Sequence, residues 1–193
     1  RAGKPVIFPT DTVFGLGVAV NHAPSPAELY QLKQRTDDKP IAWLVGSIDD
    51  LARYGKNVSA QALELARAHW PGALTLIVEA SDEVLPAYRS AVGTIALRVP
   101  NDPTARALIE QVGPLATTSA NISGEPAPTR TEELSPALTA CVATVTGKAL
   151  GGHASAVVDC TQTPARVVRQ GAIALDLAAN DSPANDSETV TRK

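Results

Sequence analysis

The feature that most constrains the fold of this chain is an alternation of continuous apolar runs with segments of helical periodicity. The runs "IAWLVG" (41–46), "ALTLIVEA" (73–80) and "TIALRVP" (94–100) have the length and composition of buried strands. Segments 59–70 and 102–113 carry apolar residues at helical spacing. This alternation predicts an α/β domain in which helices flank one sheet.

Local signals place the other elements. A helix over 25–36 is predicted, with Ser25 as N-cap, Pro26 in the first turn and Glu28 completing a capping box. Asp102 is the expected N-cap of the helix over 102–113. Further strands are expected at 4–10, 114–120, 141–146, 155–161 and 165–173, and short helices at 47–55 and 131–138. Because strands cluster late in the chain, the sheet is predicted to be mixed and twisted rather than purely parallel.

The end of the chain differs from the rest. From residue 177 onward, "LAANDSPANDSETVTRK" has neither periodicity nor enough apolar residues for a core. The sequence therefore predicts one domain over residues 1–176 and a disordered tail over 177–193.

Charge and cysteine content exclude several classes of protein. The formal net charge is -3, so the chain is not a generally basic protein that coats nucleic acid. Cys141 and Cys160 are the only cysteines and form no CxxC pair, and both are expected to be buried free thiols. No apolar run reaches the ~18–20 residues needed to span a membrane, which makes the cytoplasm the expected location.

The stretch "FPTDTVFGLG" (8–17) allows three interpretations: a phosphate-binding loop, a catalytic site, or a turn. No GxxxxGK[ST] or GxGxxG motif occurs in the chain, which argues against the phosphate loop. We expect Thr10 and Thr12 to present their hydroxyls at the end of a strand, while Gly15 and Gly17 let the chain turn away.

Three other groups of polar residues have both a structural and a functional interpretation. Cations at 33, 35 and 39 either complement the end of a helix or bind phosphates. The crowded hydroxyls and amide of 117–123 form either a local turn or a ligand site at a strand end. Arg98, inside a strand pattern, either lies on an exposed face or binds a carboxylate in a cleft.

Seven motifs in order carry a resemblance to a known family. They are "FPTDTVFGLG", "KQR" followed by "KP", "HWPGALTLIV", "VGTIALRVP", "TSANISGEPAPT", "SAVVD" and "VRQGAI". Over roughly residues 3–175 the chain resembles the YrdC/Sua5 family of L-threonylcarbamoyladenylate synthases, in the short single-domain form. The resemblance implies a twisted α/β sheet that encloses a large concave cavity.

The resemblance also implies a reaction. L-threonine, bicarbonate and ATP give threonylcarbamoyl-AMP and pyrophosphate, for the N6-threonylcarbamoyl modification of adenosine 37 in tRNAs that read ANN codons. A partner threonylcarbamoyl transferase complex completes the modification, and direct contact with tRNA or double-stranded RNA is a further implied possibility. Mg²⁺ is expected on the ATP phosphates, with no metal ligands from the protein.

The resemblance assigns roles residue by residue. Residues implied to bind L-threonine are Thr10, Thr12, Arg98, Thr117 and Ser155. Residues implied to bind ATP are Lys33, Arg35, Lys39, Thr94, Ser119, Asn121 and Arg169. Of these, Lys33, Arg35, Ser119 and Asn121 are the implied catalytic set.

The sequence departs from the family pattern at three positions and leaves two other functions open. Leu44 stands where many members carry histidine, Ala127 replaces a common serine, and Ala156 replaces a common threonine. One alternative is an RNA-binding module of the same fold without turnover, which the near-neutral charge disfavours. The other is a carbamoyl-transfer relative, whose usual zinc-finger and acylphosphatase modules do not occur in this sequence.

Overall fold

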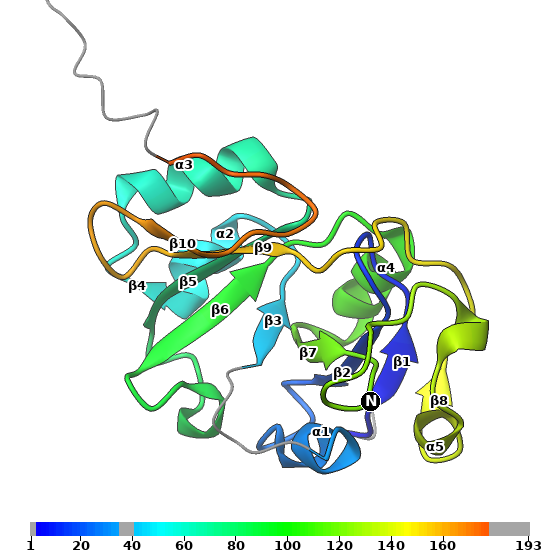
Figure 1. Cartoon of the computed structure of the whole chain (residues 1–193). Helices are drawn as coiled ribbons and strands as arrows, with labels where there is room; N and C mark the ends of the chain where they lie inside the picture. The colour runs from blue at the N-terminus through cyan, green and yellow to red at the C-terminus, as the bar shows by residue number, and fades with distance from the viewer. Residues whose placement is uncertain (1–2, 35–40, 178–193) are drawn as a thin grey trace, which may run out of the picture.

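A single ten-stranded sheet forms the centre of the molecule (Figure 1). The structure is a computed structural model, and it describes residues 3–34 and 41–177. The strand order is β10-β9-β5-β6-β3-β7-β2-β1-β8, and β4 pairs with β5 outside this path. Arg35, Lys39 and residues 178–193 of the predicted tail lie outside the described residues, whereas Leu177, the first residue of that tail, packs against the large core.

The strands are short and the helices are few. The strands are β1 (Val6–Phe8), β2 (Gly15–Ala19), β3 (Ala42–Leu44), β4 (Gly55–Lys56), β5 (Leu74–Ala80), β6 (Thr94–Arg98), β7 (Leu115–Ser119), β8 (Ala143–Thr144), β9 (Ala156–Asp159) and β10 (Arg166–Arg169). The α-helices are α1 (Ala27–Leu32), α2 (Asp49–Tyr54), α3 (Ala60–His69), α4 (Pro103–Val112) and α5 (Pro136–Thr139), and 3-10 turns occupy Pro86–Tyr88 and Thr131–Glu133.

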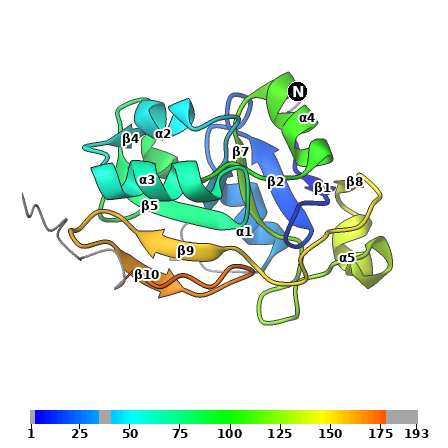
Figure 2. The ribbon, with the colours of Figure 1, turned by 90° about the horizontal axis from the view of Figure 1, so that it is seen from above.

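Strand pairing confirms the predicted mixed sheet. The pairs β1–β8, β3–β6 and β5–β9 are parallel, whereas β1–β2, β2–β7, β3–β7, β5–β6, β4–β5 and β9–β10 are antiparallel. Figure 2 shows α2 and α3 together along β5, and α5 beside β8 at the other end. The fold is therefore the expected α/β arrangement of one mixed sheet with flanking helices.

The two faces of the sheet serve different purposes. Alternate side chains of a strand point to opposite faces, so Leu76 of β5 and Trp43 of β3 enter the large core that also contains residues of α1, α2 and α3. On the other face, Leu44 and Leu115 pack with Ile109 of α4 in a smaller core. The rest of that second face remains open and forms the wall of a cavity.

The helix caps predicted at α4 and α1 have different outcomes. Asp102 accepts a hydrogen bond from the backbone N–H of Ala105 at 2.9 Å, as expected for an N-cap. At α1 the predicted capping box is absent, and the helix ends at Leu32 rather than near residue 36. Glu28 instead forms an exposed ion pair with Lys4, 3.7 Å away. This contact depends on where the N-terminal segment lies, which no local pattern indicates.

The prediction that Gly15 and Gly17 let the chain turn away is wrong. They do not turn the chain away, because they lie in β2, a fully buried strand between β1 and β7. A Cβ atom on Gly17 would lie 2.8 Å from Thr117 Oγ1 and 3.0 Å from a ring carbon of Phe8. Glycine is required here because the two neighbouring strands bring their side chains over the backbone.

The cysteines divide between core and surface. Cys160 is buried as predicted, but Cys141 is exposed, so the expectation of two buried thiols is half wrong. Burial, with a smaller contribution from Asp159, raises the pKa of the Cys160 thiol to about 12. Cys141 follows the four-residue helix α5, whose buried contact to the core is Leu138.

Candidate functional site

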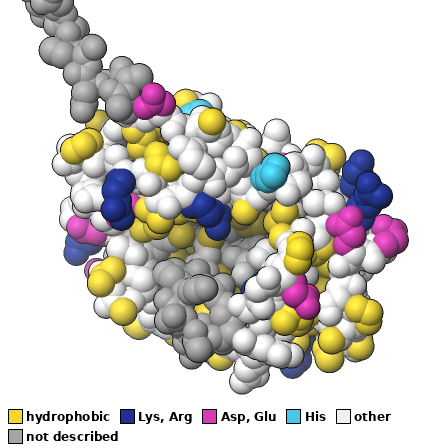
Figure 3. Space-filling model, viewed as in Figure 1, with side chains coloured by type: hydrophobic (Ala, Val, Ile, Leu, Met, Phe, Trp, Pro, Cys, Tyr) yellow, Lys and Arg dark blue, Asp and Glu magenta, His cyan; other side chains and the backbone are white. Residues whose placement is uncertain are grey.

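A cavity of about 650 Å³ opens on the uncovered face of the sheet. The face drawn in Figure 3 is hollowed near its centre. The walls come from strands far apart in the sequence and from the turn after β1. The lining residues are Thr10, Thr12, Val13, Phe14, Gly15, Ala42, Leu44, Thr75, Ile77, Ala96, Arg98, Thr117, Thr118, Ser119, Ala154, Ser155, Val157, Val168 and Arg169. A mostly apolar wall with a few convergent polar groups is typical of a small-molecule site of this size.

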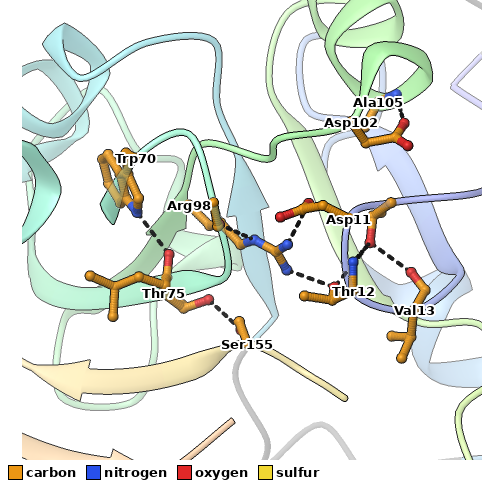
Figure 4. Close-up of polar contacts among 12 residues, drawn as sticks. Asp11, Thr12, Val13, Trp70, Thr75, Arg98, Asp102, Ala105 and Ser155 are labelled. Carbon is orange, nitrogen blue, oxygen red and sulfur yellow. Dashed lines mark hydrogen bonds and ion pairs between the residues drawn. The ribbon is translucent and has the colours of Figure 1, made fainter. Parts of the chain in front are cut away.

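Arg98, at the end of β6, is the most constrained charge in this cavity. Only 5% of the residue is exposed, which excludes the interpretation of an arginine on an exposed face. Figure 4 shows its guanidinium between three partners. Nη2 donates to Asp11 Oδ1 at 2.6 Å, Nη1 to Thr12 Oγ1 at 2.9 Å, and Nε to the carbonyl of Gly72 at 2.9 Å. Three of the five donor hydrogens of arginine are thus used within the protein, and two remain for a ligand.

Burial and Asp11 act on Arg98 in opposite directions. Burial lowers the pKa of the Arg98 guanidinium, and the charge and hydrogen bond of Asp11 raise it. The side chains of the pair are 7% and 10% exposed. Asp11 does not line the cavity, so it stabilises the cation without occupying the space that a ligand would use. Asp11 was not predicted as a site residue, although it lies inside the quoted "PTDT".

The hydroxyls of Thr10 and Thr12 shape the turn after β1. Thr10 Oγ1 donates to the carbonyl of Val13 at 2.7 Å and accepts from the backbone N–H of Thr12 at 3.1 Å. The 3.0 Å contact between the two hydroxyls must therefore be donated by Thr12, since a hydroxyl has one hydrogen. Both hydroxyl hydrogens are used internally. The Thr10 oxygen already accepts two hydrogen bonds, whereas the Thr12 oxygen, which accepts one from Arg98, has one lone pair left for a ligand.

A second cation, Arg169 of β10, also lines the cavity. Its Nε and Nη2 donate to the carbonyl of Ser155 at 3.3 and 2.9 Å. Burial lowers the pKa of Arg169, and the nearby charge of Arg98 lowers it further. Two guanidiniums that repel each other across one cavity favour an anion between them.

Lys33, at the C-terminal end of α1, reaches across to the end of β7. Its buried Nζ donates to the carbonyls of Ser119 and Asn121 at 2.6 and 2.8 Å, and to Asn121 Oδ1 at 3.0 Å. Ser119 Oγ also donates to Asn121 Oδ1, and Asn121 Nδ2 to the carbonyl of Glu125. Lys33 and the "SAN" segment, 86 positions apart, therefore form one cluster of which only Ser119 lines the cavity.

Of the remaining predicted site residues that the structure describes, Thr117 lines the cavity and Thr94 does not. Thr117 lines it, with its hydroxyl bonded to the carbonyl of Leu115 in its own strand at 3.0 Å. Thr94 shares the face of Ala96 and Arg98 on β6 but does not line the cavity, and its hydroxyl contacts Ser90 Oγ at 2.7 Å. The predicted Arg35 and Lys39 lie outside the described residues.

Two of the three departures from the family pattern can be located in this geometry. Leu44 lines the cavity, so the change from histidine places an apolar side chain on the cavity wall. Ala156 is fully buried in the large core, on the face away from the cavity, and its change from threonine leaves the cavity wall unaltered. The third, Ala127, is partly exposed in the loop after β7.

Residues 3–34 and 41–177 contain neither a cluster of metal ligands nor a membrane-spanning helix. No group of three or more His, Cys, Asp or Glu side chains gathers there in a way that could hold a metal ion. No helix in this part of the chain is long and apolar enough to cross a membrane.

Comparisons with known proteins agree with this architecture. The Sua5/YciO/YrdC family pattern, described as telomere recombination, matches residues 1–171. A putative threonylcarbamoyl-AMP synthase of Mycobacterium tuberculosis is 37% identical over 181 residues, which are 93% of this chain and 83% of the relative. The threonylcarbamoyl-AMP synthase of Bacillus subtilis is 35% identical over 177 residues, covering 90% of this chain and 51% of the relative.

A solved structure gives the same result in three dimensions. The crystal structure of P. abyssi Sua5 complexed with L-threonine matches with a TM-score of 0.82 and 33% identity, over 88% of this chain and 51% of that one. The chain thus spans about half the length of the B. subtilis and P. abyssi proteins. On the match of the family pattern and of these relatives over most of its length, this chain belongs to the Sua5/YciO/YrdC family.

Proposed function

We propose that this chain is a threonylcarbamoyl-AMP synthase, which makes threonylcarbamoyl-AMP and pyrophosphate from L-threonine, bicarbonate and ATP. The observation that carries the proposal is the cavity with two guanidiniums, Arg98 and Arg169, on its walls. Support comes from relatives named for this activity and from a related structure with bound L-threonine.

The reaction brings anions together, and the cavity suits that requirement. The threonine amine adds to the carbon of CO₂ derived from bicarbonate and loses a proton, which gives a carbamate. A carbamate oxygen then bonds to the α-phosphorus of ATP, and the bond from that phosphorus to the pyrophosphate oxygen breaks. Fixed cations and hydrogen-bond donors offset the repulsion between carbamate and phosphate, and holding both reactants in one cavity brings them into line. The steps need no protein nucleophile.

On the threonine side, Arg98 offers its two remaining donor hydrogens to the carboxylate of the amino acid. Thr12 keeps one lone pair, which suits an N–H group of the substrate amine, and Thr10, whose hydroxyl is fully used within the turn, holds Thr12 in place. Thr117 and Ser155 complete this part of the cavity wall.

On the nucleotide side, Arg169 and Ser119 line the cavity. Lys33 does not line it, but donates hydrogen bonds to the carbonyls of Ser119 and Asn121. We assign Lys33 to positioning that segment, and its positive charge to the attraction of the ATP phosphates. Arg35, Lys39 and Thr94 remain predicted contacts to ATP. Mg²⁺ bound to the phosphates would reduce their charge, and no described residue is assigned to it.

The product serves a tRNA-modifying threonylcarbamoyl transferase complex, with the cytoplasm as the place of reaction. Direct contact with tRNA belongs to the same proposal, and the formal net charge of -3 does not favour it.

The test is pyrophosphate release by the purified chain with ATP and Mg²⁺. Release that requires both L-threonine and bicarbonate is expected, with Arg98→Met as the matched inactive variant. Release independent of threonine, or none from a folded sample, would refute the proposal. A second assay replaces threonine and bicarbonate by carbamoyl phosphate. Pyrophosphate release with carbamoyl phosphate alone would favour the carbamoyl-transfer alternative over the synthase.

A further inference from the structure

One polar side chain, that of Thr75, lies inside the apolar strand β5. Thr75 is the only hydroxyl residue of β5, "LTLIVEA", and it is 4% exposed. Its hydroxyl lies 2.8 Å from that of Ser155, which is 6% exposed. Both residues line the cavity, and Figure 4 shows them facing each other across β5 and the start of β9. We call these two residues the hydroxyl pair.

The hydroxyl pair has hydrogen-bonding capacity left over. Two hydroxyls carry two hydrogens, and the contact between them uses one. Among the described residues, neither hydroxyl has another hydrogen-bond partner. One donor hydrogen and several lone pairs are thus available to a ligand group in the cavity. Because threonine is β-branched and stiff at χ1, Thr75 also restricts the rotamer of the Ser155 hydroxyl.

The same two strands place an apolar surface directly beside the hydroxyl pair. Ile77 follows Thr75 by two residues on β5, and Val157 follows Ser155 by two residues on β9, so all four side chains share one face. The parallel register sets Thr75 opposite Val157. Ile77 and Val157 both line the cavity, and we call them the apolar step.

We propose that the hydroxyl pair binds the β-hydroxyl of the amino-acid substrate and the apolar step contacts its γ-methyl, which makes Thr75 a specificity-determining residue. The inference rests on the proposed function and deepens it. A β-carbon with one hydroxyl and one methyl matches a wall on which a polar and an apolar surface adjoin. Valine, the isostere without the hydroxyl, would leave the hydroxyl pair without its partner, and sites built to bind a hydroxyl reject such analogues strongly.

The experiment compares L-threonine, L-valine and L-serine as substrates for the parent chain, Thr75→Val and Thr75→Ser. Pyrophosphate release gives kcat/KM for each amino acid, and calorimetry gives the affinity for threonine and, separately, for ATP. In Thr75→Val we expect a loss of at least tenfold in kcat/KM and affinity for threonine. The value for valine and the affinity for ATP should not change. Thr75→Ser, which keeps the hydroxyl, should retain the preference of the parent for threonine over valine.

The methyl contact has its own variant. Ile77→Ala should reduce the preference for threonine over serine, which a methyl contact sets at roughly 10–200-fold, without changing the preference over valine.

Several outcomes would overturn the inference. One is an equal loss for threonine and valine in Thr75→Val, which indicates a general structural role, and another is no loss at all. If circular dichroism shows that Thr75→Val is unfolded, Thr75→Ser is compared with Thr75→Ala instead. Only Thr75→Ala should lose the preference for threonine over valine, and an equal preference in both variants would contradict the inference. Failure of the proposed function is distinct: the parent chain itself would then release no threonine-dependent pyrophosphate. Calorimetry on the parent would still decide the inference, because equal affinity for threonine and valine, or none for either, would contradict it.

Discussion

Replacing Asp11 by asparagine should destabilise the folded protein strongly while changing its shape little. Asparagine keeps an oxygen acceptor near the position of Oδ1 but removes the charge that faces Arg98. The guanidinium then stays in a site where burial already lowers its pKa, without the carboxylate that opposes this effect. The cost is therefore that of a buried charge whose partner has been removed.

The structure sets the size of this effect. Removing one partner of a buried ion pair costs about 3–5 kcal/mol, and both side chains here are at most 10% exposed. Two features reduce the figure: Arg98 keeps its bonds to Thr12 and Gly72, and it borders an open cavity. We expect a loss of about 2–4 kcal/mol in the free energy of unfolding, which for a chain of this length lowers Tm by roughly 4–16 °C.

Urea unfolding at pH 7, followed by circular dichroism, measures the loss directly. The matched control is Asp102→Asn, a buried aspartate that caps α4, because asparagine caps a helix about as well as aspartate. The double variant Asp11→Asn/Arg98→Met should lose less stability than the sum of the two single changes. Strict additivity, or a loss in Asp11→Asn no larger than in the control, would show that the ion pair does not stabilise the fold as argued.

Four further predictions concern other parts of the chain. Lys33→Met removes the ammonium that donates to Ser119 and Asn121, and should cost about 2–3 kcal/mol of unfolding free energy and weaken ATP binding at least tenfold. Unchanged ATP affinity by calorimetry would contradict the positioning role. Gly17→Ala should cost about 1–3 kcal/mol in urea unfolding, because its Cβ would meet the side chain of Thr117; an unchanged midpoint would refute the close approach. Iodoacetamide at pH 8 should alkylate Cys141 and spare Cys160 in the folded protein, as mass spectrometry can check. Since burial raises the pKa of Cys160 from 9.0 to about 12, the folded state holds a proton that the unfolded state releases. The stability from this group should be complete below pH 9 and be lost as pH rises toward 12, and Cys160→Ala should reduce that alkaline loss.

Elements with local signals could be predicted from the sequence, and elements fixed by distant neighbours could not. Strand β5 and helix α4 carry unbroken patterns and their own caps or stops, and both form as predicted. Strand β2 was missed because glycine is rare in strands. Its glycines are needed because Phe8 and Thr117, on two separate neighbouring strands, approach its backbone.

The candidate site shows the same division. The sequence identified Arg98, Thr12 and Ser155 as site residues, and the cavity contains them. It did not identify the partners that fix them, such as Asp11, which is 87 positions from Arg98. For Thr75, the sequence offers one signal, a polar residue inside an apolar run. That signal fits a residue of a buried site, and it fits a residue on an exposed strand face equally well. Only the register of β5 against β9 tells these two interpretations apart.

The partners of each cation explain how the cavity can hold positive charge before any substrate arrives. Asp11 offsets the charge of Arg98, and the carbonyls of Ser119 and Asn121 surround the ammonium of Lys33. Arg169, bound to the carbonyl of Ser155, has Arg98 as an unfavourable neighbour. Because the first two cations already have partners, a ligand adds contacts rather than replacing them, and little reorganisation is needed on binding. The charge of Arg98 still disfavours the neighbouring charge of Arg169, so an anionic substrate that contacts both arginines of this cavity would relieve that repulsion.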